Sequence, residues 1–174
     1  MRMKKLLAPM PMLAVGLLLG AAARLFDIYC QMLGAVFSQM SVWILLGTLI
    51  SVYSPSQKAA MLNILPFCMG MLLTYYATAI ITRGVYSWSF ILGWTAFALL
   101  SPVMACFAWM AKQGGALSKI IGVGIVLVSI LSSVLLFDRL RVYDFVIDGA
   151  LVYFIFFKRI DRRESEMKTQ EERS

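Results

Sequence analysis

Five charged side chains lie close together in residues 137–149, FDRLRVYDFVIDG, between two strongly apolar stretches. They are Asp138, Arg139, Arg141, Asp144 and Asp148. On an α-helix, at about 100° per residue, all of them except Arg139 fall on one stripe roughly 120° wide. Arg141 and Asp144 are three residues apart, and Asp144 and Asp148 are four apart, so they are neighbours on the helix surface. Such carboxylates can bind a proton or a cation, and the arginine can pair with them or bind an anion.

The length of the last apolar run decides whether these charges lie inside a membrane. Residues 149–157 are nine uncharged residues, which cover about 14 Å at 1.5 Å per residue, less than half of a hydrocarbon core of roughly 30 Å. A span of about 20 residues that ends at Phe157 must therefore begin near Asp138. Asp148 would then lie near the middle of the bilayer, with Asp144 about one turn nearer the outer side. Because a bare carboxylate is costly there, we expect the stripe to face protein or a water-filled cavity.

Three interpretations of the charged stripe are open. It is an internal ion-pair brace with Asp148 paired or neutral, a site for a solute, cation or proton, or part of a short or re-entrant last span. In the binding interpretation, Asp148, Asp144 and Arg141 contact the substrate. The supporting charges, predicted on the same outer side, are then Arg24, Arg83 and Asp138.

The composition is that of an integral membrane protein. Of the 174 residues, 61% are hydrophobic and 14% charged, with a mean hydropathy of +0.82, whereas soluble domains are about 45–50% apolar and about 25% charged. The net charge of +7 does not indicate nucleic-acid binding, because the basic residues lie in short gaps between apolar runs and at the two ends. There is no histidine, and the three cysteines form no CxxC pair. With no activated nucleophile visible either, we expect no catalysis, no metal and no cofactor.

Six apolar runs predict an all-α, polytopic protein whose single domain, residues 1–157, is a six-transmembrane-helix bundle. The predicted spans cover approximately residues 6–23, 32–53, 59–82, 85–111, 120–137 and 138–157. With the N-terminus inside, the inner segments hold 12 of the 16 basic residues and the outer segments 4. This bias predicts an N-in/C-in protein of the cell (inner, cytoplasmic) membrane, with residues 158–174 as a charged cytoplasmic tail. Alternatively, residues 1–23 are a cleaved secretory signal, which leaves five spans.

Weaker signals concern helix packing. Gly16 and Gly20 form a GxxxG motif, GLLLG, which predicts a close helix contact within the chain or between chains. Several polar residues and prolines inside the predicted spans either hydrogen-bond between helices or line a cavity. They are Ser38, Gln39, Ser41, Asn63, Pro66, Ser101 and Pro102.

The segment SPSQKAAMLNILPFCMGMLLTYY, residues 54–76, is similar to a family of small, uncharacterised bacterial multi-pass membrane proteins. In that family a Ser-Pro-basic-Ala-Ala turn precedes a helix that ends in Tyr-Tyr. The matching residues here are Ser54, Pro55, Lys58, Ala59, Ala60, Tyr75 and Tyr76. The resemblance implies a type of fold and no activity.

We therefore expect a protein that binds or transports a small solute or ion in the lipid bilayer, or that serves as the membrane subunit of a transporter. Asp148 and Asp144 would be its polar centre. The alternative function is a non-catalytic assembly protein, which forms a homo-oligomer or joins a membrane complex. In that case GLLLG and the charged tail provide the contacts, and the Asp/Arg stripe is only a brace.

Overall fold

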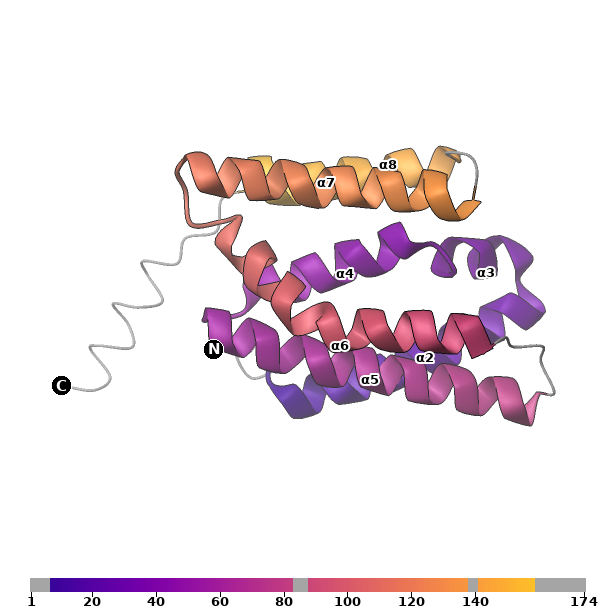
Figure 1. Ribbon diagram of the computed structural model, residues 1–174. Helices are drawn as coiled ribbons and strands as arrows, with labels where there is room; N and C mark the ends of the chain where they lie inside the picture. Colours follow the sequence, from indigo (N-terminus) through magenta and orange to yellow (C-terminus); the bar gives the residue numbers. More distant parts are fainter. Residues whose placement is uncertain (1–6, 83–87, 138–140, 159–174) are drawn as a thin grey trace.

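The structure, a computed structural model, describes residues 7–82, 88–137 and 141–158, and every regular element in these ranges is a helix, as the composition predicts. Figure 1 shows the helices running lengthwise through an elongated bundle. In chain order they are α2 (Pro9–Tyr29), α3 (Gln31–Phe37), α4 (Met40–Tyr53), α5 (Gln57–Ile81), α6 (Trp88–Met110), α7 (Ala116–Phe137), α8 (Val142–Val152) and the π-helical turn η1 (Tyr153–Phe157).

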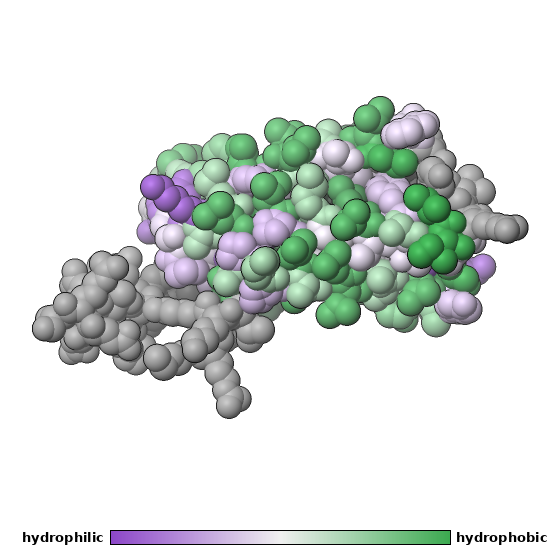
Figure 2. Space-filling view, turned by 90° about the horizontal axis from the view of Figure 1, so that it is seen from below, coloured by the Kyte–Doolittle hydropathy of each residue, from purple (hydrophilic) through white to green (hydrophobic). Residues whose placement is uncertain are grey.

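Four of the described helices are long and apolar enough to cross a membrane, and five spans result if the bent pair α3 and α4 counts as one. Their outer faces carry many exposed large apolar side chains, among them Leu18, Leu73, Leu92 and Leu135. Figure 2 shows apolar side chains spread over one face of the bundle, with the most hydrophilic ones toward its ends. An exterior of this kind matches a hydrocarbon solvent.

The first long helix differs from the predicted span 6–23. It begins at Pro9, a residue favoured in the first turn of a helix, and continues past Arg24 to Tyr29. The helix continues through Arg24 because arginine is a good helix former. The charge of Arg24 is compensated locally: Nη1 lies 3.7 Å from Asp27 Oδ2, and the guanidinium lies 5.9 Å from the centre of the Tyr75 ring.

The second predicted span, 32–53, is broken at Ser38 and Gln39 into α3 and α4, which are bent by 58°. Gln39 is extended, with φ −78° and ψ 135°, so the helical hydrogen-bond ladder is interrupted there. The indole Nε1 of Trp43 donates to the Phe37 carbonyl at 2.8 Å and satisfies one of the acceptors that the break releases. Gly34 lets α3 fold back on α2, since a Cβ at this position would lie 2.7 Å from the Asp27 Cα.

The helices α2 and α5 form the closest contact, a glycine seam made by Gly16 and Gly20 of α2 and Gly70 of α5. A Cβ on either glycine of α2 would lie 2.1 Å from a backbone carbonyl oxygen of α5, and one on Gly70 would lie 2.8 Å from the Leu13 carbonyl oxygen. Thr74 Oγ1 also donates across the seam to the Leu17 carbonyl at 2.7 Å. The GLLLG motif is therefore used within the chain.

The other helices are arranged around this pair, with α6 packed against α5. In Figure 1, α4 lies between the layer of α2, α5 and α6 and the layer of α7 and α8. Pro102 lies inside α6, where a proline removes a backbone hydrogen bond and bends a helix. The last part of α6 rises toward α7 in the same view.

The last helical segment is shorter than the predicted span 138–157. It begins at Val142, with Arg141 as the N-cap, and ends at Phe157 in the π-helical turn, so it has sixteen residues. At 1.5 Å per residue it is roughly 24 Å long. Residues 138–140 lie outside the described ranges.

Candidate functional site

A group of polar side chains is buried where α4 begins and where it meets α7 and α8. We call it the carboxylate cluster: Gln39, Ser41, Ser129, Asp144 and Asp148. All but Asp148 are fully buried, and Asp148 is 8% exposed. The cluster brings three helices together in an otherwise apolar bundle, and both predicted carboxylates belong to it.

Asp148 is the carboxylate with the fewest partners. Its Oδ1 accepts a hydrogen bond from the Ser129 hydroxyl at 2.6 Å. Within the described ranges, no basic side chain lies within salt-bridge distance of it. It is the seventh residue of the last helical segment, about 9 Å from its start by the helical rise. An apolar, deep position with a single neutral donor leaves its charge to be compensated by a proton or a bound cation.

Asp144 has a different environment. It lies at position N3 of α8, where its Oδ2 accepts the backbone N–H of the N-cap, Arg141, at 2.8 Å. The Ser41 hydroxyl donates to Oδ1 at 3.4 Å. The N-terminus of a helix also favours a negative charge through its unpaired N–H groups. Asp144 therefore caps the helix, and its charge is compensated by backbone.

Arg141 is directed to the Tyr143 side chain. Its Nη1 donates to the Tyr143 hydroxyl, and its guanidinium carbon lies 5.7 Å from the ring centre. The same hydroxyl also accepts from Gln39 Nε2 at 3.3 Å. The Gln39 side-chain oxygen, which is buried, has no hydrogen-bond partner in the described part of the chain. Arg141, Tyr143 and Gln39 thus form one wall of the cluster.

The predicted supporting charges do not join this cluster in the described residues. Arg24 pairs with Asp27, one turn further along its own helix. Arg83 and Asp138 lie outside the ranges that the structure describes.

Two polar residues that sequence reasoning missed are central to these contacts. The first is Ser129, which donates a hydrogen bond to Asp148. The sequence feature that could have identified it is its spacing from Ser133, four residues further on, which puts both fully buried hydroxyls on one face of α7. Asp27 is the second. Its Oδ2 accepts from the Tyr75 hydroxyl at 2.9 Å and its Oδ1 from the Ser38 hydroxyl at 3.3 Å, so it joins α2, α5 and the end of α3. Its i,i+3 spacing from Arg24 is the sequence feature that could have identified it.

The described residues contain no group of three or more His, Cys, Asp or Glu side chains that could hold a metal ion. The three cysteines are free thiols. A cation at Asp148 would be bound by one carboxylate and hydroxyl oxygens, the ligands of hard cations.

Comparisons with protein-family models, with characterised proteins and with solved structures find no match to this chain.

Proposed function

We propose that the chain crosses the cell membrane six times with both termini in the cytoplasm. Two observations support this topology. The basic residues divide 12 to 4 between the two predicted sides. The described lysines lie within or next to the first or last turn of a helix at one end of the bundle, the left end in Figure 1, which we call the lysine end. They are Lys58, Lys112, Lys119 and Lys158. Arg24 and Arg141 lie toward the opposite end. The sixth span would be the sixteen residues of α8 and η1.

We further propose that the protein binds a small cation or a proton at Asp148 and moves it, alone or with a solute, across the membrane, itself or as the membrane subunit of a transporter. The observation that carries this proposal is the environment of Asp148: buried, in contact with the Ser129 hydroxyl at 2.6 Å, and with no described basic partner. An ionised carboxylate is costly at this depth unless it is neutralised. A proton and a cation can each neutralise it, and the exchange of one for the other is the elementary step of a cation-coupled carrier.

The two carboxylates have separate roles in this proposal. Asp144 accepts the backbone N–H of Arg141 and the Ser41 hydroxyl, so it fixes the start of α8 and the position of Ser41. Asp148 has the one exchangeable charge of the cluster. Arg141 and Gln39 both contact the Tyr143 hydroxyl beside these acids.

The alternative function, as an assembly protein, depends on two features of the chain: the GLLLG motif and the charged tail. Its contact motif, Gly16 and Gly20, faces α5 within the same chain. Its other support, the tail 158–174, lies outside the described residues except for Lys158.

The test uses the purified full chain in detergent and in liposomes. Thermal unfolding is measured with Na⁺, K⁺ or Li⁺ against choline at constant ionic strength, and dissipation of a pH gradient is followed with a pH-sensitive dye. A cation at 100 times its Kd stabilises the folded state by about 2.7 kcal/mol. We expect one of the cations or a proton flux to depend on Asp148 and to be lost in Asp148→Asn.

Asp27→Asn is the matched control. It removes a carboxylate of another group, so it should lower stability and leave the response to cations and the flux intact. If Asp148→Asn and Asp148→Leu both fold and behave as the wild type in every one of these measurements, the proposed function is wrong.

A further inference from the structure

An apolar cavity of about 320 Å³ lies between α4, α5, α6 and α7, apart from the carboxylate cluster. It exists because small residues at helical spacing face one another across it, and small side chains leave the space between helices unfilled. On α4, α6 and α7 these small residues are Gly47, Ser51, Ser101, Ala105, Ala108 and Gly124.

The polar groups on the cavity wall are largely used by the protein itself. Ser51 Oγ donates to the Gly47 carbonyl at 2.6 Å, and Ser101 Oγ donates to the Ala98 carbonyl at 2.7 Å. Thr48 adds one further hydroxyl. The surface that these hydroxyls leave exposed in the cavity is small, and nearly all of the wall is apolar. The cavity therefore suits an apolar ligand.

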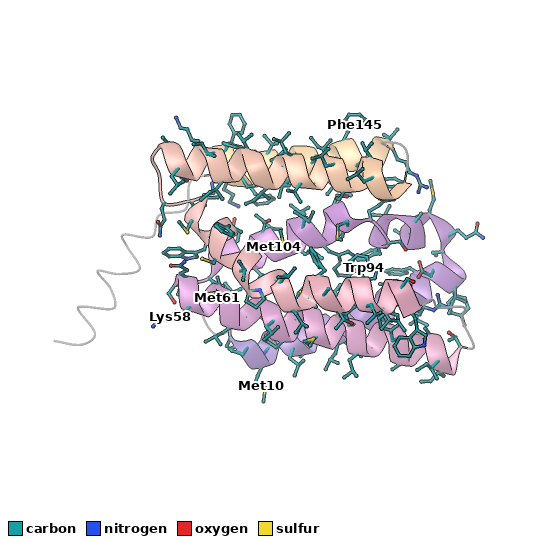
Figure 3. The ribbon with its side chains drawn as sticks, in the orientation of Figure 1. Met10, Lys58, Met61, Trp94, Met104 and Phe145 are labelled. Atoms are coloured by element: carbon teal, nitrogen blue, oxygen red, sulfur yellow. The ribbon has the colours of Figure 1, made fainter. Side chains whose placement is uncertain are left out.

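The cavity opens sideways, between α6 and α7. Three of its wall residues are also substantially exposed on the outside: Met104 at 41%, Phe107 at 49% and Val128 at 45%. Figure 3 shows Met104 on the side of α6 that faces α4 and α7. If these helices cross a bilayer, the opening faces lipid chains and not water.

The depth of the cavity matches one leaflet. Along α6 its wall runs from Phe97 to Ala108, eleven residue steps, which is about 16 Å at 1.5 Å per residue. Half of a hydrocarbon core of roughly 30 Å is about 15 Å. The wall begins about one turn inside the lysine end and reaches the middle of the bundle. A lipid chain that enters from that side would cover the same distance.

Positive charge lies where the headgroup of such a lipid would be. Lys112 follows Ala108 by four residues, and the exposed Lys119 precedes the wall residue Ile121 by two. Each lysine near a membrane surface contributes about 1 kcal/mol of attraction to anionic lipid. Lys112 Nζ also donates to the Lys158 carbonyl at 2.7 Å, which holds its ammonium group at this end of the bundle.

We propose that the cavity binds one acyl chain of an anionic glycerophospholipid, whose phosphate contacts Lys112 and Lys119. The lipid enters sideways from the leaflet at the lysine end and fills the space between α6 and α7. This site requires that α4 to α7 cross the membrane, and it does not depend on Asp148.

The test is native mass spectrometry of the purified full chain with phosphatidylglycerol and phosphatidylcholine of identical acyl chains. Gly124→Leu is designed to fill the cavity, because Gly124 lies on its wall and a Cβ there meets nothing within 4 Å. Gly93→Leu is the matched control: Gly93 is a membrane-helix glycine with equally open space, exposed and outside the wall. We expect one phosphatidylglycerol on the wild type and on Gly93→Leu, and at least tenfold lower occupancy on Gly124→Leu.

Further variants separate the chain from the headgroup. Lys119→Gln should reduce the preference for phosphatidylglycerol and leave the weaker binding of phosphatidylcholine unchanged. Gly47→Leu, where a Cβ meets only the end of the Ile64 side chain at 3.5 Å, replaces Gly124→Leu if that variant does not fold. Asp148→Asn should retain the lipid even if it abolishes cation binding. Equal lipid occupancy on wild type and the folded cavity-filling variant overturns the site, as does a wild type without lipid, and equal binding of the two headgroups overturns the anionic lipid.

Discussion

The stability cost of removing the hydrogen bond from Ser129 to Asp148 reports whether the Asp148 carboxylate is ionised or neutral. The two oxygens are 2.6 Å apart, short enough for a charge-assisted bond. Bonds to a charged group contribute about 1.5–3 kcal/mol, whereas neutral interhelical bonds in membranes average about 0.6 kcal/mol. The cost of Ser129→Ala therefore differs by roughly 1 kcal/mol or more between an ionised and a neutral Asp148.

We predict that Ser129→Ala costs about 1.5–3 kcal/mol of unfolding free energy when Asp148 is ionised, at alkaline pH or with a saturating cation. In the Asp148→Asn background, where the acceptor is a neutral amide, the same change should cost about 0.6 kcal/mol. Unfolding in mixed detergent micelles, followed by circular dichroism, measures both values in one double-mutant cycle.

The control is Ser129→Thr, which keeps the hydroxyl and should restore most of the loss if the added methyl fits. A cost near 0.6 kcal/mol in both backgrounds at every pH and cation concentration would show that the carboxylate stays neutral. That result would refute the exchangeable charge and favour a purely structural Asp148.

Three further predictions concern the parts that position the cluster. Gly16→Ala places a Cβ 2.1 Å from the Phe67 carbonyl oxygen and should destabilise the protein by about 1–3 kcal/mol, whereas Gly93→Ala, in open space, should stabilise it slightly; thermal unfolding in detergent compares the two. Tyr75→Phe removes the donor to Asp27 at 2.9 Å and should cost about 1.5 kcal/mol by the same measurement, and no loss would mean that the bond does not stabilise the folded protein. Asp144→Ala removes the cap of α8 and should cost about 1 kcal/mol while leaving the cation response in place; loss of that response in a folded protein would assign Asp144 to the binding site.

The sequence allows the helical class and the position of the long apolar helices to be predicted, because length and hydropathy are local properties. It does not reveal the break at Gln39. A single extended residue interrupts α3 and α4, and the contacts that compensate it, such as Trp43 to Phe37, depend on how the chain folds back. The same limit applies to Arg24, which looks like the end of a span until Asp27 and Tyr75 are placed beside it.

The candidate site also has one part that the sequence predicts and one part that depends on packing. The i,i+4 spacing of Asp144 and Asp148 puts both acids on one face of the last helix. Their different environments could not be predicted, because they depend on where α8 begins. Its N-cap, Arg141, lies three residues before Asp144, which makes Asp144 a capping residue and leaves Asp148 inside the helix. Ser129, the partner of Asp148, lies 19 residues earlier on a different helix and becomes a neighbour only through packing.

The glycine seam between α2 and α5 also sets the order in which the chain assembles during synthesis. The hydrogen bond from Thr74 to Leu17 connects residues 57 positions apart, with α3 and α4 between them in the chain. When translation proceeds from the N-terminus, α2 is made long before its closest partner. A nascent chain arrested before Gly70 presents the GLLLG face to lipid or to the insertion machinery, and a chain arrested after Ile81 has the means to bury it. We therefore expect α2 to remain without its closest partner until α5 is made, while the bent pair α3 and α4 is synthesised between them.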